Sequence, residues 1–263
     1  MNEAELVFTQ ILNCDRTSLY LNRNSSLVKN KLSLIPSIFK RRIQGEPIPY
    51  ILGKTEFMGL EFKVSPDVFI PRQETEILVE TVMKYVAGYK SQVTSKRILD
   101  VGTGSGCIAI SLAKLLSNVN IMATDISKKA LRVAIFNANL HKVKINFVQS
   151  DLFSTIDHRP STIDYIVSNP PYIPTAEIDD LQPEIRHEPR IALDGGKDGF
   201  DFYRRIIKES PHYLKKGGFL IMEIGYNQRK DIENIFRKQK TFAIIEVIKD
   251  YNNIERVIVA QKY

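Results

Sequence analysis

The chain has 263 residues, 43% of them hydrophobic and 25% charged, which is the composition of a globular protein with one large core and room for a small accessory domain. No apolar run reaches the roughly 18–20 residues that a membrane-spanning helix needs, and the first five residues are acidic where a targeting peptide is basic, so we expect a cytoplasmic protein with no membrane partner. The net charge of +7 permits an anionic partner, but the longest basic run, Lys40-Arg41-Arg42, is short, and no stable nucleic-acid complex is expected.

The beginning of the chain predicts a small helical domain followed by a hairpin. Within residues 1–52, apolar residues recur at helical spacing between polar stretches. Gly45–Pro49 contains two prolines and ends this helical pattern. Residues 53–70 then alternate as a β-hairpin does, with the turn at Met58-Gly59 or near Ser65-Pro66. We expect this hairpin to link two domains.

Residues 71–263 alternate between short apolar runs and helical stretches, which predicts an α/β fold with a doubly wound, Rossmann-like sheet. The seven predicted strands are Arg97–Val101, Val119–Thr124, Ile145–Gln149, Ile163–Ser168, Phe219–Ile224, Phe242–Ile248 and Arg256–Ala260. Among the predicted helices are Cys107–Ser117, Lys128–His141 and Arg229–Gln239.

A glycine loop follows the first of these strands, in the segment RILDVGTGSGC. Dinucleotide-binding loops read GxGxxG, whereas this loop reads GxGxG and has Cys107 where the last glycine should stand, so a pyrophosphate site is disfavoured. The loop resembles the S-adenosylmethionine loop of class I methyltransferases, in which glycine lets the backbone approach the cofactor closely. The predicted cofactor-binding residues here are Gly102, Thr103, Gly104, Ser105 and Gly106.

Two aspartates end the next two strands. Asp125 is placed to accept hydrogen bonds from both ribose hydroxyls of a nucleoside cofactor, and Asp151 to accept one from an adenine amino group, with Leu152 covering the ring. Open α/β sheets bind their ligands at the carboxyl ends of the strands, so three ligand-type segments after three successive strands predict one site.

The fourth strand ends in NPPYIP, which begins at Asn169. The prolines fix φ and cannot donate hydrogen bonds, so the carbonyls there are fixed in direction. The side-chain oxygen of Asn169 and the backbone carbonyl of Pro170 would hold the two hydrogens of a planar NH2 group, and Tyr172 would stack on it. The predicted catalytic residues are Asn169, Pro170 and Tyr172, Pro171 joins them in substrate binding, and Asn169 also borders the cofactor.

No metal is expected, because neither cysteine belongs to a CxxC pair and no two histidines have the i, i+4 spacing of a helical metal site.

The NPPY motif alone does not identify the nitrogen that is methylated, because the motif also occurs in enzymes that act on adenine or guanine amino groups.

From about Arg41 to Val259 the chain resembles the release-factor glutamine methyltransferases, the HemK/PrmC family. The resemblance is carried by RRIQGEPIPYILG, EFMGLEF, IPRQETEILVE, NPPYIP, HEPRIALDGGKDG and DYNNIERVIVA. It implies a helical substrate-docking domain (1–52), a hairpin linker (53–70) and an S-adenosylmethionine-dependent methyltransferase domain (71–263). Arg72 and Thr75 would border the methionine end of the pocket, and Gln73 departs from the proline that is more frequent in the family.

The resemblance also implies a substrate: the glutamine of the Gly-Gly-Gln motif in class 1 peptide-chain release factors, methylated on its side-chain nitrogen by a monomeric enzyme. The alternative is a nucleic-acid methyltransferase acting on adenine N6 or guanine N2, which the basic charge favours mildly. A non-catalytic binding protein that uses the same fold as a scaffold is a third reading.

Overall fold

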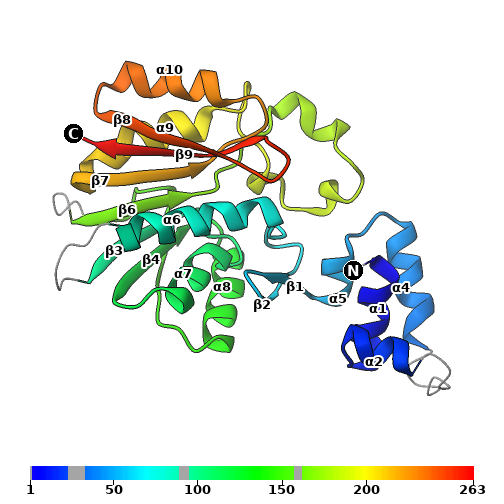
Figure 1. The fold of residues 1–263 in the computed structure, drawn as a ribbon. Helices are drawn as coiled ribbons and strands as arrows, with labels where there is room; N and C mark the ends of the chain where they lie inside the picture. The colour runs from blue at the N-terminus through cyan, green and yellow to red at the C-terminus, as the bar shows by residue number, and fades with distance from the viewer. Residues whose placement is uncertain (1, 23–32, 89–94, 157–161) are drawn as a thin grey trace.

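Short helices at the start of the chain form a unit that lies beside the larger domain (Figure 1). The structure is a computed structural model that describes residues 2–22, 33–88, 95–156 and 162–263. Residues 23–32 of the predicted helical domain lie outside the described residues. The helices here are α1 (Glu3–Leu12), α2 (Arg16–Leu21), α4 (Leu34–Ile43) and α5 (Ile48–Leu52).

Local sequence explains where these helices begin and what holds them together. Asn2 and Glu5 form a capping box at the start of α1, each side chain accepting from the backbone N–H of the other. Helix α5 was not predicted, although proline near the first position of a helix is tolerated because that N–H needs no partner. The apolar core of this unit consists of Val7, Ile11, Ile35, Ile38, Ile48, Ile51 and Leu52.

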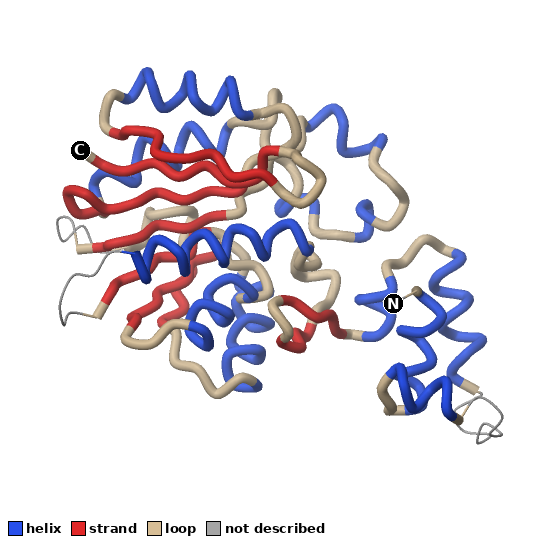
Figure 2. The backbone as a smooth tube through the Cα atoms, in the orientation of Figure 1, coloured by secondary structure: helices blue, strands red, loops and turns tan. Residues whose placement is uncertain are grey.

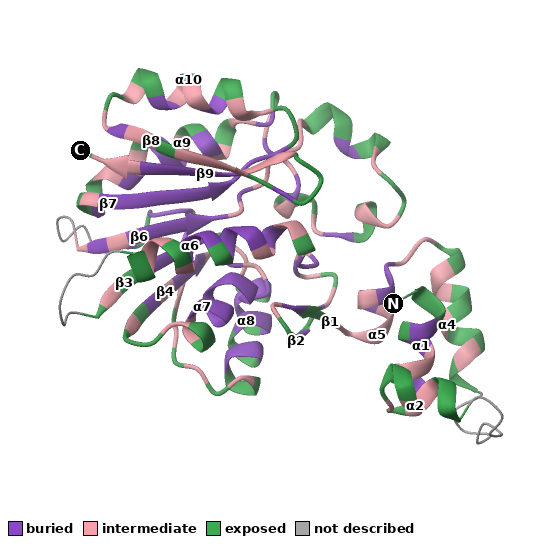
Figure 3. Cartoon of the chain, viewed as in Figure 1, coloured by how far each residue is buried: buried purple, intermediate pink, exposed green. Residues whose placement is uncertain are grey.

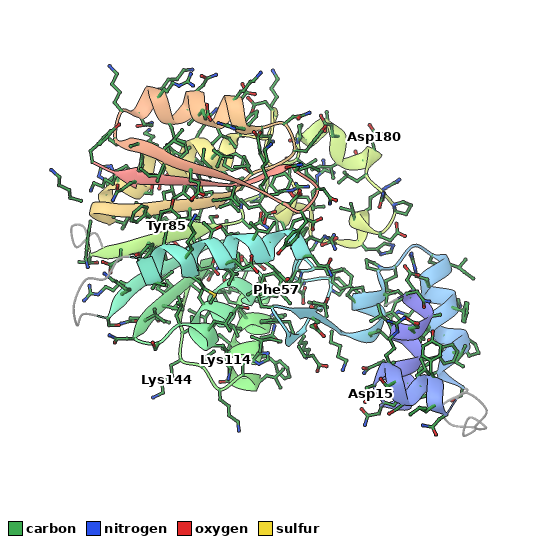
Figure 4. All side chains as sticks on the ribbon, viewed as in Figure 1. Asp15, Phe57, Tyr85, Lys114, Lys144 and Asp180 are labelled. Carbon is green, nitrogen blue, oxygen red and sulfur yellow. The ribbon has the colours of Figure 1, made fainter. Side chains whose placement is uncertain are left out.

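An antiparallel hairpin, β1 (Lys54–Phe57) and β2 (Leu60–Lys63), follows α5. Its turn is at Met58-Gly59, the first of the two predicted positions, and both residues have positive φ as a type I′ turn requires. Phe57, labelled in Figure 4, is buried in the core of the larger domain. Asn137 receives a hydrogen bond from the Lys63 backbone N–H (2.8 Å) and donates to the Lys63 and Ser105 carbonyls (3.0 and 2.9 Å), which ties the hairpin to the glycine loop.

Seven strands form one sheet in the order β5-β4-β3-β6-β7-β9-β8, all parallel except β9. Figure 2 shows the strands of this sheet in red. This confirms the predicted seven-stranded doubly wound fold. The strand β7 begins at Leu214, five residues before the predicted start, because Leu214 pairs with Ile163. The strands are β3 (Lys96–Val101), β4 (Val119–Asp125), β5 (Asn146–Gln149), β6 (Ile163–Ser168), β7 (Leu214–Glu223), β8 (Phe242–Lys249) and β9 (Glu255–Lys262).

Helices cover both faces of the sheet (Figures 1 and 3). Successive strand residues point to opposite faces, so Ile98 packs in one core cluster and Leu99 in the other. One face is covered by α6 (Glu76–Gly88), α7 (Cys107–Leu115) and α8 (Lys128–Leu140), the other by α9 (Asp201–Glu209) and α10 (Arg229–Gln239). Five 3₁₀ helices complete the described elements: η1 (Gln73–Thr75), η2 (Thr175–Asp180), η3 (Ile185–His187), η4 (Arg190–Ala192) and η5 (Ser210–His212).

Among the described residues, no helix is both long and apolar enough to cross a lipid bilayer.

Candidate active site

The carboxyl ends of β3, β4, β5 and β6 border one cavity of about 340 Å³. Parallel strands bring the residues that follow them to the same edge of the sheet, so segments separated by up to seventy residues in sequence meet here. Of the predicted site residues, all but Gly106 line the cavity: Gly102, Thr103, Gly104, Ser105, Asp125, Asp151, Leu152, Asn169, Pro170, Pro171 and Tyr172.

The glycines of the loop serve two different purposes. Gly102 and Gly104 have φ of +76° and +56°, and a Cβ on either would meet no atom within 4 Å, so they leave open space. A Cβ on Gly106 would lie 2.9 Å from Ile110 and 3.1 Å from the Cβ of Ala134. Gly106 therefore allows α7 and α8 to pack closely, and the structure places it behind the cavity wall.

A buried carboxyl that was not predicted lies under this loop. The Thr103 hydroxyl donates to Asp100 Oδ2 at 2.7 Å, and Asp100 is fully buried. Burial raises the pKa of Asp100 to about 7. Asp100 is the last residue but one of β3, and Asp125 is the last residue of β4. This position near the end of a strand is the feature of the sequence that could have indicated Asp100 as a site residue.

Asp125 holds the loop and faces the cavity. Its two carboxylate oxygens accept the backbone N–H groups of Gly104 and Ser127, each at 2.8 Å. Burial raises the pKa of Asp125, and these two hydrogen bonds partly oppose that rise. Each carboxylate oxygen has a second lone pair, so the group keeps acceptor capacity for a ligand in the cavity.

Asp151 has a basic partner that the sequence did not indicate. Arg205 on α9 lies 2.9 Å from Asp151 Oδ2, and both side chains are more than 40% exposed, so this ion pair adds little stability. Leu152 is buried and has φ of +52°, a conformation that a leucine rarely adopts. Asp151 and Leu152 both line the cavity.

The Asn169 amide has a defined orientation. Its Nδ2 donates to the Thr75 hydroxyl oxygen at 3.2 Å, and Thr75 comes from η1, directly before α6. With its nitrogen bound in this way, Oδ1 of Asn169 accepts no hydrogen bond from the described part of the chain and has capacity for a ligand. Thr75 and Arg72 also line the cavity.

Three glycines from two segments pack against Tyr172: Gly195 and Gly199 of DGGKDG, and Gly225, which follows β7. A Cβ on Gly195 would lie 2.8 Å from Tyr172 Cα, one on Gly199 would lie 2.5 Å from its carbonyl oxygen, and one on Gly225 would lie 2.9 Å from its ring. Gln228 donates to the Tyr172 carbonyl at 2.9 Å. The segment DGGKDG, for which the sequence suggested no chemistry, therefore supports the backbone of the NPPY motif.

Glu188 ties the segment after β6 to Ile70 and Arg72. It accepts the Ile70 N–H at 2.9 Å and pairs with the Arg72 guanidinium, and only 1% of its side chain is exposed. Burial raises the pKa of Glu188, and the charge of Arg72 opposes that rise. Glu188 was missed because its partners lie more than one hundred residues away in sequence.

Replacing Gly195 with alanine should displace the NPPY motif. The added methyl group would overlap Tyr172 Cα and the Gly199 backbone, neither of which moves cheaply, and such overpacking costs about 1–3 kcal/mol. We expect a lower melting temperature and a turnover reduced about tenfold or more, because small displacements of reacting groups are costly. Gly88→Ala is the matched control, since a Cβ there meets nothing within 4 Å. Equal turnover in the two variants would contradict the supporting role of Gly195.

Comparisons with known proteins identify relatives of this chain. The chain matches the family described as Methyltransferase small domain over residues 60–196, and the family described as PrmC N-terminal domain over residues 1–53. It is 40% identical over 258 residues to the release factor glutamine methyltransferase of Geobacter sulfurreducens, covering 97% of this chain and 87% of that protein. It is 39% identical over 264 residues to the release factor glutamine methyltransferase of Thermodesulfovibrio yellowstonii, covering 100% and 92%.

A solved structure extends the comparison to the fold. The 16S rRNA N2 G1207 methyltransferase RsmC of T. thermophilus, in complex with AdoMet and guanosine, aligns with a TM-score of 0.56 and 16% identity over 80% of this chain and 50% of that one. At this identity the likeness concerns the fold alone.

Proposed function

Since the chain belongs to the release factor glutamine methyltransferase family, we propose that it transfers a methyl group from S-adenosylmethionine to the side-chain amide nitrogen of the glutamine in the Gly-Gly-Gln motif of class 1 release factors. The observation that carries this proposal is the position of Asn169, Pro170 and Tyr172 on the same cavity wall as the glycine loop. A planar amide and a methyl donor would meet there.

The cavity residues fit S-adenosylmethionine. Gly102 and Gly104 leave the space that a Cβ would occupy, and Asp125 keeps lone pairs for the ribose hydroxyls. Asp151 and Leu152 would contact the adenine ring, and Arg72 and Thr75 would border the methionine end. When bound, this cofactor supplies an electrophilic methyl group on a sulfonium.

Asn169 and Pro170 would prepare the nitrogen for attack. A glutamine amide is a poor nucleophile because its nitrogen lone pair is delocalised into the carbonyl. Asn169 Oδ1 and the Pro170 carbonyl would accept its two hydrogens, and Tyr172 would pack on the amide plane. The lone pair is then directed at the methyl carbon, and positioning of this kind contributes up to about 7–11 kcal/mol of barrier reduction. As the N–C bond forms, the S–CH3 bond would break and the sulfur would leave as the neutral thioether of S-adenosylhomocysteine. The nitrogen would then be cationic and lose a proton to water, so no strong base is needed.

The remaining assignments are proposals of the same kind. Residues 1–52 would dock the release factor, residues 53–70 would link the domains and residues 71–263 would hold the catalytic site, in line with the match of residues 1–53 to the PrmC N-terminal domain. We place the enzyme in the cytoplasm as a monomer that forms no stable complex with nucleic acid.

The alternative substrate is an exocyclic amino group of adenine or guanine, since the same acceptors suit it. Incubation of the enzyme with methyl-labelled cofactor and either a class 1 release factor or total RNA and DNA separates the two. We expect label in the release factor, and mass spectrometry of its tryptic peptides should place the added methyl group on the Gly-Gly-Gln glutamine. Label found only in nucleic acid would reject the assignment.

A further inference from the structure

A buried glutamate, Glu223, lies behind Asn169. The register pairs Ser168 of β6 with Met222 of β7, so the residues that follow, Asn169 and Glu223, are neighbours at the carboxyl ends of adjacent strands. Ile221 packs in the core cluster that contains α6, and Glu223, two residues on, faces the same side of the sheet. Only 3% of Glu223 is exposed.

The surroundings of the Glu223 carboxyl consist mainly of groups that belong to the site. Burial raises the pKa of Glu223 to about 7, and the charge of Glu74 adds to that rise, whereas the polar side chains of Thr75 and Asn169 and the charge of Arg256 lower it. Thr75 is also the residue whose hydroxyl oxygen accepts from Asn169 Nδ2. Among the described residues, Oε2 of Glu223 has no hydrogen-bond partner, although it is fully buried.

A buried carboxyl with an unpartnered oxygen is costly, so its presence needs a reason. Leucine or methionine at this position would extend the apolar run of β7 without that cost. A carboxylate can accept hydrogen bonds on both of its oxygens, which an apolar side chain cannot do. At Glu223 this acceptor capacity lies beside the Asn169 amide.

This acceptor capacity decides which way the Asn169 amide points. The oxygen and the NH2 group of an asparagine have nearly the same shape, so the two orientations differ mainly in their hydrogen bonds. The amide donates from its NH2 group to Thr75, and the register of β6 and β7 places Glu223 beside it. In the reverse orientation its NH2 group would face the NH2 group of the substrate, and two donors repel each other.

We propose that Glu223 is a positioning residue that, together with Thr75, fixes the Asn169 amide so that Oδ1 faces the substrate nitrogen. This inference rests on the proposed function, because it assumes that Asn169 Oδ1 binds the reacting amide. Glu223 itself touches neither substrate nor cofactor.

Glu223→Gln is the direct test, because glutamine has nearly the same size but replaces one acceptor oxygen with an NH2 group. That NH2 group would favour the reversed Asn169. We expect kcat on the release factor to fall about 10-fold to 100-fold, while KM and the Kd of S-adenosylmethionine change less than about threefold. Glu80→Gln, an exposed position on α6, is the matched control and should behave as the unmodified enzyme.

Thr75→Val provides a second variant should Glu223→Gln fail to fold. Valine keeps the shape of threonine and removes the oxygen that accepts from Asn169, so kcat should fall, and Thr75→Ser, which keeps the hydroxyl, should lose less. Equal losses in the valine and serine variants would overturn the proposal.

Combining Glu223→Gln with Asn169→Ala separates positioning from a structural role. If Glu223 acts through Asn169, it should add almost nothing to the loss already caused by Asn169→Ala, whereas independent effects on stability would add in full. Full additivity, or an unchanged kcat in Glu223→Gln, would overturn this inference. Failure of the proposed function looks different, since Asn169→Ala itself would then keep near-normal turnover.

Discussion

Asn169→Ala should lower turnover on the release factor by about 10²-fold to 10³-fold, which is the scale of losing one preorganised polar group in a transition state. The reason is geometric: Nδ2 is bound to Thr75, so Oδ1 is the part of the side chain left to hold a substrate hydrogen. Alanine removes that acceptor, and the amide nitrogen of the substrate then keeps its delocalised lone pair. Single-turnover kinetics at saturating cofactor would measure this effect.

The affinity for S-adenosylmethionine should change only severalfold in Asn169→Ala, because the glycine loop and Asp125 are intact. Asn139→Ala is the matched control: Asn139 is exposed on α8 and does not line the cavity, so both its turnover and its affinity should be unchanged. Near-normal turnover in Asn169→Ala would reject the mechanism in which its side-chain oxygen holds the substrate.

Much of this site follows from one rule, and the same rule indicates what was missed. Polar residues directly after buried strands meet at one edge of a parallel sheet, which places Asp125 and Asn169 in a single cavity. Glu223 ends the apolar run FLIME in the same manner, and Asp100 ends RILD. Both are charged residues near the end of an apolar strand, and that position is the signal by which the sequence indicates them.

Other features were not predictable from local pattern. Glu188 pairs with Arg72, and Gly195 packs against Tyr172, only because the segment after β6 folds back over the sheet edge. Nothing in the residues around Gly195 specifies that partner. Helix α5 was missed for a different reason: prolines usually end helices, but here Pro47 and Pro49 stand at the start of one.

Asp125→Ala should chiefly weaken the binding of S-adenosylmethionine. A hydrogen bond to a charged group contributes about 1.5–3 kcal/mol, so losing two to the ribose should raise Kd about 100-fold or more. The loop should also lose order, because the Gly104 and Ser127 N–H groups lose their acceptor. Isothermal titration calorimetry would give the Kd, and turnover at saturating cofactor should fall much less than in Asn169→Ala.

Three comparisons make the Asp125 experiment specific. Asp125→Asn keeps one acceptor oxygen and should fall between alanine and the unmodified enzyme, whereas Asp180→Ala, an exposed aspartate labelled in Figure 4, should leave Kd unchanged. Burial raises the pKa of Asp125, so this side chain becomes protonated at a higher pH than an ordinary carboxylate does. Cofactor binding should weaken as the pH falls through that range, and Asp125→Asn should abolish this pH dependence. An unchanged Kd in Asp125→Ala would reject its role at the ribose, because no other described carboxylate on the cavity wall is bonded to the glycine loop.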